Sequence, residues 1–270
     1  MSTRPRTGKL PLPELVDMKR RQDKIVMVTA YDAWSARLLA ETSVDCLLVG
    51  DSAMMVIHGE RDTLGATPEL MAMHTRAVAR AAPGKFLVAD MPFLALRRGR
   101  THALDCAAAL LRAGAHAVKV EGARGQVALI HHLVESGIPV MGHLGLTPQR
   151  VHALGGYRVQ GRGPADAAQL RQDAADLEGA GVFALVLECI PGSLARMVTA
   201  ERAVPTIGIG AGRHCDGQVL VLHDLLGFNP DFKPRFVRHF GAGASLVHKG
   251  VTDFAQAVQS GKFPTAKESF

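Results

Sequence analysis

Eight short apolar runs, most of them separated by segments with helical periodicity, are the feature that most constrains the fold of this chain. The runs are rich in Val, Ile and Leu, as is typical of parallel strands that helices cover. They occupy residues 25–30, 44–51, 86–92, 117–122, 138–145, 183–190, 205–212 and 218–224. Eight strands that alternate with helices in one undivided chain predict an α/β protein with a single (β/α)8 TIM barrel.

The alternative architecture is an open, doubly wound sheet. Its best support is the segment GIGAG at 208–212, which overlaps an apolar run. This segment lacks the Gly-x-Gly-x-x-Gly spacing of dinucleotide-binding turns and comes late in the chain, so the barrel is favoured. No linker or low-complexity tract divides the 270 residues. We therefore expect residues 1–270 to form one barrel domain with a short N-terminal helical extension and C-terminal helices.

Helix boundaries can be predicted at several places between the runs. Thr67 precedes a proline and is a candidate N-cap, and Thr101 is a second candidate. In the segment 164–181, Leu170, Ala174 and Leu177 fall on one face of a helix that glycines end. These signals predict where the covering helices begin and which sides they bury.

Composition limits the classes of function. The formal net charge of +6 suits anionic substrates or nucleic acid, but the basic clusters are short and aromatic residues make up only 5% of the chain. We therefore expect small-molecule substrates and no nucleic-acid partner. No apolar run approaches the length of a membrane span, so no membrane partner is expected either. The four cysteines are scattered without a CxxC pair, which favours buried reduced thiols and a cytoplasmic location.

Charged and polar residues stand at the carboxyl ends of five predicted strands, which is where the active sites of barrels lie. These residues are Asp51, Asp90, Lys119, Glu121, His143 and Glu188. Taken alone, each has an ordinary explanation: the aspartates can cap helices, Lys119 and Glu121 can form a structural ion pair, and His143 can be a satisfied core histidine. Polar residues at the same end of five strands favour a functional cluster instead.

The residue types suit metal-assisted proton abstraction beside a carbonyl group. Asp51 and Asp90, with a further carboxylate nearby, offer the hard oxygen ligands that Mg²⁺ prefers. Such an ion polarises a carbonyl and stabilises a developing enolate. A separate carboxylate, Glu188, could act as the general base, while Lys119 and the Ser52 hydroxyl could hold an anionic or carbonyl group. The spacing alone does not identify the substrate.

Longer motifs cover nearly the whole chain. They are TAYD (29–32), LLVGDS (47–52), HTRAVAR (74–80), VADMPF (88–93), RAGAHAVKVEG (112–122), GHLGLTPQ (142–149), GGYRVQGRG (155–163), LVLECIP (185–191), and IGIGAG with CDGQVLVLHD (207–224). Together and in this order, they resemble the 3-methyl-2-oxobutanoate hydroxymethyltransferase family, also called ketopantoate hydroxymethyltransferase.

This resemblance implies a (β/α)8 barrel that uses Mg²⁺. It implies transfer of a hydroxymethyl group from the cosubstrate 5,10-methylenetetrahydrofolate to 2-oxoisovalerate, through a metal-stabilised enolate. The product would be 2-dehydropantoate (ketopantoate), an intermediate in pantothenate and coenzyme A biosynthesis. The family commonly forms a decamer of two pentameric rings, so a homo-oligomer is implied for this chain as well.

The resemblance also assigns roles to residues. It implies that Asp51 and Asp90 bind Mg²⁺, with Glu121 beside the metal and its waters. Glu188 would be the general base that removes the C3 proton. Substrate binding is implied for Asp51, Ser52, Asp90, Lys119 and His143. The residues that bind the folate stay unassigned.

The chain departs from the family pattern near these residues. Met54 is bulky where the family usually has a small residue, Gly65 stands in place of a proline, and Ala123 stands in place of a glycine. Two alternatives follow from these departures. One is a related metal–enolate barrel enzyme, a lyase or aldolase, that acts on another 2-oxo acid. The other is a weakly active paralogue with a binding or assembly role.

Overall fold

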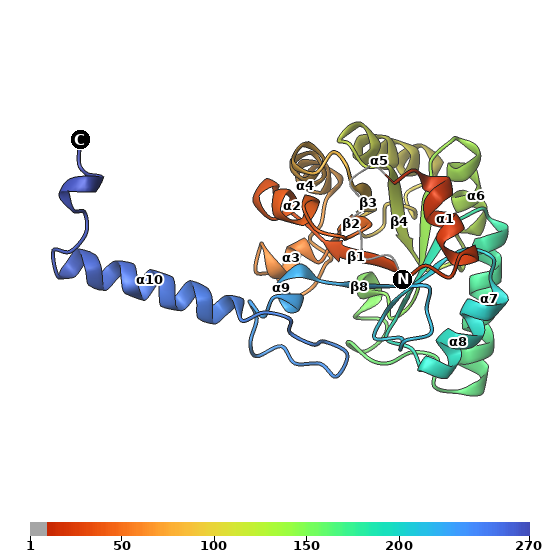
Figure 1. Ribbon diagram of the computed structural model, residues 1–270. Coiled ribbons are helices and arrows are strands. Elements are labelled where there is room, and N and C mark those ends of the chain that lie inside the picture. The colour runs from red at the N-terminus through yellow and green to blue at the C-terminus, as the bar shows by residue number, and fades with distance from the viewer. Residues whose placement is uncertain (1–9) are drawn as a thin grey trace. The chain divides into compact units, whose positions relative to one another are not determined.

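The computed structural model describes residues 10–270 and contains a closed barrel of eight parallel strands (Figure 1). The strands are β1 (Ile25–Thr29), β2 (Cys46–Val49), β3 (Phe86–Asp90), β4 (Ala117–Glu121), β5 (Val140–Gly145), β6 (Ala184–Glu188), β7 (Thr206–Ile209) and β8 (Gly217–Leu220). Each strand pairs with the next along the chain, and β8 closes the barrel by pairing with β1. The predicted (β/α)8 barrel is confirmed, and the open sheet is wrong.

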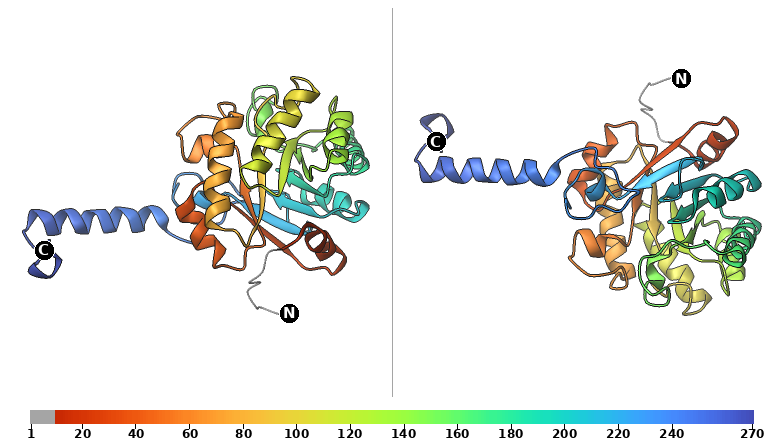
Figure 2. Two further views of the ribbon diagram at one scale, coloured as in Figure 1. Left: turned by 90° about the horizontal axis from the view of Figure 1, so that it is seen from above. Right: turned by 90° about the horizontal axis from the view of Figure 1, so that it is seen from below.

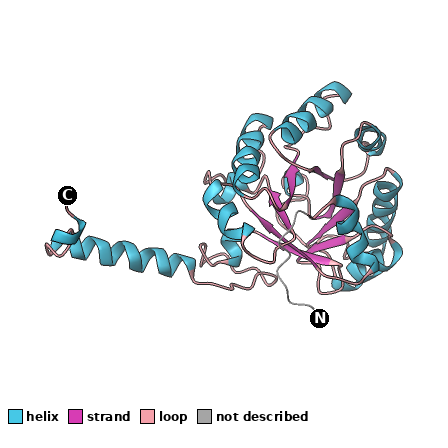
Figure 3. Ribbon diagram, turned by 45° about the horizontal axis from the view of Figure 1, so that its top comes forward, coloured by secondary structure: helices cyan, strands magenta, loops and turns pink. Residues whose placement is uncertain are grey.

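Helices surround the strands on the outside of the barrel (Figures 2 and 3). They are α2 (Ala33–Ala40), α4 (Pro68–Ala81), α5 (Arg100–Arg112), α6 (Val127–Glu135), α7 (Pro164–Gly179) and α8 (Gly192–Glu201). Two short helices, α3 (Ala53–Val56) and the 3₁₀ turn η1 (Pro148–Arg150), lie in the loops after β2 and β5. These two loops approach the candidate site described below.

Helix α1 (Leu12–Arg20) precedes the first strand and helps to fill the barrel core. Its side chains Leu15 and Met18 are fully buried and belong to the same apolar cluster as Ile25, Cys46 and Phe86, which begin β1, β2 and β3. Burying one such aliphatic side chain stabilises a fold by about 1.5–3 kcal/mol. Helix α1 therefore closes the amino-terminal end of the barrel, opposite the end where the polar residues gather.

Several predicted helix features are confirmed, and one is wrong. Thr67 is the N-cap of α4, because its side chain accepts a hydrogen bond from the backbone N–H of Leu70. The predicted apolar face of α7, formed by Leu170, Ala174 and Leu177, is buried. Thr101, in contrast, lies inside α5, whose N-cap is residue 99.

The last predicted strand, 218–224, is only partly correct. Strand β8 ends at Leu220, where its pairing with Val28 of β1 also ends. The next residues form the short helix α9 (Leu222–Leu225). The apolar pattern continues past the last paired residue, so periodicity alone did not mark the end of the strand.

The chain divides into two compact units, the first ending at Leu220 and the second comprising Val221–Phe270. The second unit contains α9, α10 (Gly243–Gln259) and the 3₁₀ turn η2 (Ala266–Glu268). The organisation of residues 1–270 as one domain stays a prediction. Within residues 10–270, no helix has both the length and the apolar composition that crossing a membrane requires.

Candidate active site

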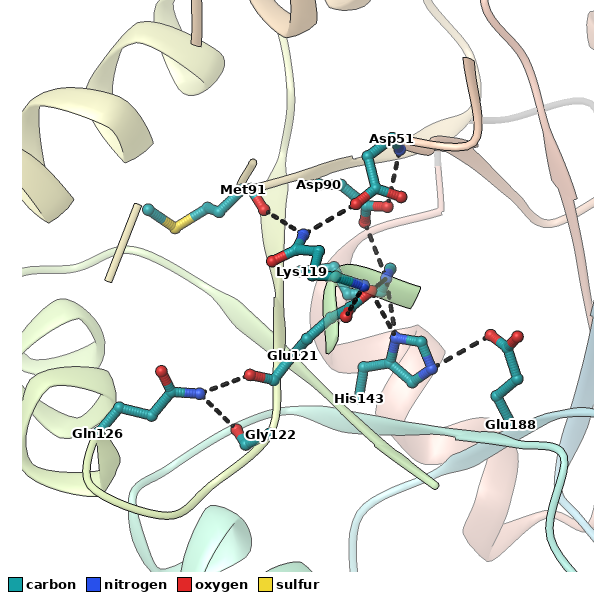
Figure 4. A network of polar contacts seen from close by, with 10 residues as sticks. Asp51, Asp90, Met91, Lys119, Glu121, Gly122, Gln126, His143 and Glu188 are labelled. Carbon is teal, nitrogen blue, oxygen red and sulfur yellow. Dashed lines mark hydrogen bonds and ion pairs between the residues drawn. The ribbon is translucent and has the colours of Figure 1, made fainter. Parts of the chain in front are cut away.

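The carboxyl ends of strands β2 to β6 bring the predicted charged residues together (Figure 4). These residues, called the strand-end cluster below, are Asp51, Asp90, Lys119, Glu121, His143 and Glu188. The parallel register sets their arrangement, because it places Asp90 beside Lys119 and Glu121 beside His143 on adjacent strands. Figure 4 shows the six side chains as one connected network of polar contacts.

The ammonium group of Lys119 is buried at the centre of this cluster, with 5% of the side chain exposed. Its Nζ lies 3.1 Å from Asp90 Oδ1 and 3.9 Å from Glu121 Oε1. Burial alone would lower the pKa of Lys119, but the surrounding carboxylates outweigh burial and hold this pKa above its ordinary value. Lys119 is therefore a permanent cation that compensates part of the buried negative charge.

The two aspartates carry charge that their surroundings disfavour. Burial, followed by the charges of Asp90 and Glu121, raises the pKa of Asp51 well above its ordinary value. Burial also raises the pKa of Asp90, although Lys119 opposes this shift. Because buried carboxylates this close repel one another, a further cation at this position would stabilise their ionised forms.

His143 connects Glu121 to Glu188. Its Nδ1 is 3.4 Å from Glu121 Oε1, and its Nε2 is 3.2 Å from Glu188 Oε2. Burial and the charge of Lys119 lower the pKa of His143, but the adjacent carboxylates of Glu121 and Glu188 outweigh both and raise this pKa to about 9. Glu188 is the most exposed of these three residues, with 17% of its side chain accessible against 4% for Glu121 and 2% for His143.

The turn after β2 places Asp51 and Ser52. The backbone N–H of Asp51 donates to Asp90 Oδ2 at 3.0 Å, and the hydroxyl groups of Ser52 and Tyr31 lie 2.8 Å apart. A Cβ atom on Gly50 would lie 2.7 Å from Ser52 Oγ. Glycine is therefore needed here, because any larger residue would displace the Ser52 hydroxyl.

The donor set of the cluster fits a divalent cation with hard ligands. Asp90 Oδ1 and Glu121 Oε1 are buried, and within residues 10–270 they face the Lys119 ammonium at 3.1 and 3.9 Å without a well-aligned hydrogen bond. In the same described region, no group of three or more His, Cys, Asp or Glu side chains has the spacing of a complete metal site. Mg²⁺ is usually held by one or two carboxylates and keeps several waters. The arrangement thus fits a partly hydrated Mg²⁺ on Asp51 and Asp90 better than a closed cage that includes Glu121.

Two neutral residues, one in contact with the cluster and one in contact with Ser52, were not assigned a role from the sequence. Gln149 Nε2 donates to Asp51 Oδ2 at 2.8 Å, and the backbone N–H of Gln149 donates to Glu121 Oε2 at 3.0 Å. Tyr31, which contacts Ser52, is buried just after β1. Both residues belong to motifs noted in the sequence, GHLGLTPQ and TAYD, and this membership was the only signal that could have found them.

The departures from the family pattern lie close to the site. Met54 is buried in α3, and a Cβ atom on Gly65 would be 3.8 Å from Met54 Sδ. The bulky residue and the missing proline are thus neighbours in space. Ala123 is also buried and follows the end of β4.

A cavity of about 350 Å³ opens beside Glu121 and Gln149. Its walls combine apolar side chains, such as Phe93, with the side chains of Arg97 and Arg150. A cavity of this size can hold part of a small organic molecule.

Carboxylates, a lysine and a histidine at the carboxyl ends of the strands define a (β/α)8-barrel enzyme with an acid–base site. The family model for ketopantoate hydroxymethyltransferase matches residues 9–266, nearly the whole chain. The chain belongs to the ketopantoate hydroxymethyltransferase family, as its sequence motifs predicted.

Similar proteins agree with this assignment. A 3-methyl-2-oxobutanoate hydroxymethyltransferase of Coxiella burnetii is 49% identical over 253 residues, which is 93% of this chain and 95% of the relative. The enzyme of the same name from Bdellovibrio bacteriovorus is 48% identical over 254 residues, which is 94% of this chain and 97% of the relative.

Among solved structures, 2,3-dimethylmalate lyase matches with a TM-score of 0.61 at 16% identity, covering 96% of this chain and 91% of that chain. Phosphonopyruvate hydrolase, solved with oxalate and Mg²⁺, matches with a TM-score of 0.61 at 12% identity, covering 95% and 92%. At these identities, the two structures support the fold alone.

Proposed function

We propose that this protein transfers a hydroxymethyl group from 5,10-methylenetetrahydrofolate to 2-oxoisovalerate, giving 2-dehydropantoate for pantothenate and coenzyme A biosynthesis. Family membership and the names of the relatives support this reaction. The observation that carries the residue roles is the buried ammonium of Lys119 among carboxylates at the strand ends. The cavity beside Glu121 offers room for part of the folate.

Asp51 and Asp90 would hold Mg²⁺, with Glu121 beside it. When bound, this ion supplies Lewis acidity that polarises the 2-oxo group and makes the neighbouring C–H bond more acidic. Lys119 and the Ser52 hydroxyl bind the oxygens of the anionic 2-oxo acid, since one provides a charge and the other a hydrogen bond. Because these groups are held in place by neighbouring strands, the substrate is oriented before the proton is removed.

Glu188 is the general base in this proposal. Of the two carboxylates beside His143, that of Glu188 is the more exposed. His143 Nε2 lies 3.2 Å from Glu188 Oε2 and orients the Glu188 carboxylate. The C3 proton of 2-oxoisovalerate moves to a carboxylate oxygen of Glu188, and C3 then forms a bond to the one-carbon unit of the folate. The two C–N bonds that hold the one-carbon unit break, water supplies the oxygen of the new hydroxymethyl group, and tetrahydrofolate leaves. Its two nitrogens take one proton from that water and the proton held by Glu188.

Proton exchange tests the role of Glu188 without the folate. Purified protein with Mg²⁺ should exchange the C3 proton of 2-oxoisovalerate into heavy water, and it should form ketopantoate when methylenetetrahydrofolate is added. Glu188→Gln should suppress both reactions, whereas Glu135→Gln, the same change at an exposed position on α6, should not. Exchange at the wild-type rate in Glu188→Gln would remove Glu188 as the base.

The alternative of a lyase or aldolase for another 2-oxo acid rests on Met54, which is buried three residues after Asp51. A bulky residue here could change which side chain of the 2-oxo acid is accepted. Turnover measured over a panel of 2-oxo acids and aldehydes distinguishes the two activities. A hydroxymethyltransferase should turn over 2-oxoisovalerate fastest, whereas a lyase or aldolase should prefer another 2-oxo acid. Rescue of a pantothenate-requiring strain would exclude the weakly active paralogue.

We also propose a cytoplasmic homo-oligomer, a decamer of two pentameric rings. The assembly is taken from the family resemblance, and the reducing compartment is supported by the four cysteines, all free and buried. Light scattering during gel filtration tests the assembly, which should have ten times the 28.7 kDa mass of the chain.

A further inference from the structure

Gln149 makes three hydrogen bonds that join the ends of three strands. Its side-chain Nε2 donates to Asp51 Oδ2 at 2.8 Å and to the main-chain oxygen of Met91 at 2.9 Å. Its backbone N–H donates to Glu121 Oε2 at 3.0 Å. Asp51, Met91 and Glu121 stand at the ends of β2, β3 and β4, whereas Gln149 comes from the turn η1 after β5. One residue therefore holds two of the three carboxylates that the sequence assigned to the metal.

We propose that Gln149 is a positioning residue, which orients the carboxylate of Asp51 to bind a divalent cation and the carboxylate of Glu121 beside that cation. The inference rests on the metal requirement in the proposed function. Both hydrogens of the amide are used, one on a carboxylate and one on a main-chain carbonyl, so the plane of the amide is fixed. A fixed donor in turn fixes the rotation of the Asp51 carboxylate, leaving Oδ1 as the oxygen for a cation.

The same division applies to Glu121. Its Oε2 accepts the backbone N–H of Gln149, whereas its buried Oε1 faces Lys119 and His143 and accepts no hydrogen bond within residues 10–270. One oxygen of each carboxylate is thus held by Gln149, and the second oxygen of Glu121 faces the strand-end cluster. Carboxylates that bind metals are commonly held in this way by groups outside the ligand set.

The neutrality of Gln149 matters as much as its position. A lysine or arginine at this position would neutralise Asp51 and compete with a metal ion for the carboxylate. An amide donates hydrogen bonds of similar geometry and leaves the negative charge of the carboxylate in place. Gln149 thus orients Asp51 without reducing the attraction of the site for a cation, while Lys119 compensates the charge of Asp90 from the other side.

Gln126 provides a matched control. It is a buried glutamine near the end of β4, whereas Gln149 is half-buried, and the Nε2 of Gln126 likewise donates two hydrogen bonds, to the main-chain oxygens of Glu121 at 2.5 Å and Gly122 at 2.8 Å (Figure 4). The difference that concerns a cation is that only Gln149 contacts carboxylate oxygens. A general effect of losing an amide that donates two hydrogen bonds should appear in both variants, whereas an effect on the cation should appear only at Gln149.

The test is binding of Mn²⁺ and Mg²⁺ alone to the full-length protein. Isothermal titration calorimetry measures the Kd of both ions, and electron paramagnetic resonance measures the Kd of Mn²⁺. Gln149→Leu should raise the Kd of both ions by roughly 10–100-fold, as expected for groups that hold metal ligands. Gln126→Leu should lower the melting temperature and leave these Kd values unchanged. At saturating Mg²⁺, Gln149→Leu should recover most of the C3 proton exchange rate. If it folds poorly, Gln149→Asn, which keeps the amide on a shorter side chain, should show a smaller rise in Kd.

Three outcomes separate this proposal from the proposed function. If wild-type protein binds neither ion, the metal requirement is wrong and the role of Gln149 fails with it. If wild-type protein binds Mn²⁺ and Gln149→Leu binds it equally well, only the role of Gln149 is wrong. If Gln149→Leu and Gln126→Leu weaken binding equally, the effect is a general loss of structure and the proposal is again overturned.

Discussion

Lys119 shows why so many charges can be buried together at one end of this barrel. A buried ion without a partner is strongly disfavoured, but Lys119 has one carboxylate two residues along its own strand and another at the paired position of β3. The pairing is mutual, because the same contacts hold the pKa of Lys119 above its ordinary value and oppose the rise in the pKa of Asp90. We therefore expect Lys119 to matter for stability as well as for the proposed binding of the 2-oxo acid.

Lys119→Met should destabilise the fold and abolish binding of the 2-oxo acid. Removing one partner of a buried pair leaves the other charge uncompensated, at a cost of about 3–5 kcal/mol. Urea unfolding followed by circular dichroism measures this loss. Arg171→Met, which breaks the exposed ion pair with Glu201 on the outside of the barrel, is the control and should change stability little. Equal stability of the two variants would contradict the structural role of Lys119.

Tyr31 should act on the substrate through Ser52. Its hydroxyl is 2.8 Å from Ser52 Oγ, so Tyr31→Phe removes the hydrogen bond that orients the serine. We expect the KM for 2-oxoisovalerate to rise roughly two- to tenfold, the equivalent of one neutral hydrogen bond, with a smaller change in kcat. In a double-mutant cycle with Ser52→Ala, the two effects should not add. Additive effects would show that Tyr31 acts independently of Ser52.

The site residues that could be predicted from the sequence are those whose charge is unusual at a strand end. Asp51, Asp90 and Glu188 were found this way, because ionisable residues after apolar runs need a reason to be there. Gln149 and Tyr31 could not be found in the same way, because neutral polar residues are ordinary in turns. Their roles depend on contacts between segments far apart in the sequence, which only the folded chain creates.

The strands and helices themselves were predicted well wherever the pattern of burial is simple. The eight strands follow from their apolar runs, and α7 from its one buried face. Errors arose at the ends of elements. The end of β8 is set by its pairing with β1, and the start of α5 by the backbone at residue 99 rather than by the hydroxyl of Thr101. Neither can be read from local composition.

Gly114 tests how closely helices α4 and α5 pack, and Gly65 serves as its control. Gly114 has a φ of +114°, and a Cβ atom there would lie 2.4 Å from Ala79 Cβ in α4, so Gly114→Ala should destabilise the fold by more than about 1 kcal/mol. A Cβ atom at Gly65 would make only an ordinary contact with Met54, so Gly65→Ala should be neutral or stabilising by up to about 1 kcal/mol. Chemical denaturation of both variants measures the difference, and equal effects would contradict the close packing at Gly114.

At the scale of the whole molecule, we expect the strand-end cluster to couple folding to the proposed binding of a divalent cation. In the folded chain, three carboxylates lie close together around Lys119, those of Asp51, Asp90 and Glu121. In the unfolded chain, the same charges are far apart. A divalent cation that binds the native arrangement but not the unfolded chain stabilises the fold by mass action. The stability of the protein should therefore depend on Mg²⁺ even without substrate.

Removal of divalent cations should lower the melting temperature, and added Mg²⁺ should restore it. The expected stabilisation is about 2.7 kcal/mol when the ion is present at about 100 times its Kd. Differential scanning calorimetry with a chelator and with graded Mg²⁺ measures this shift. Asp51→Asn should melt at the same temperature with and without Mg²⁺, because the substitution removes the negative charge of a proposed ligand. The control Asp17→Asn, on the exposed face of α1, should respond to Mg²⁺ like wild type. A Mg²⁺ response that persists unchanged in Asp51→Asn would place the stabilising ion elsewhere in the chain.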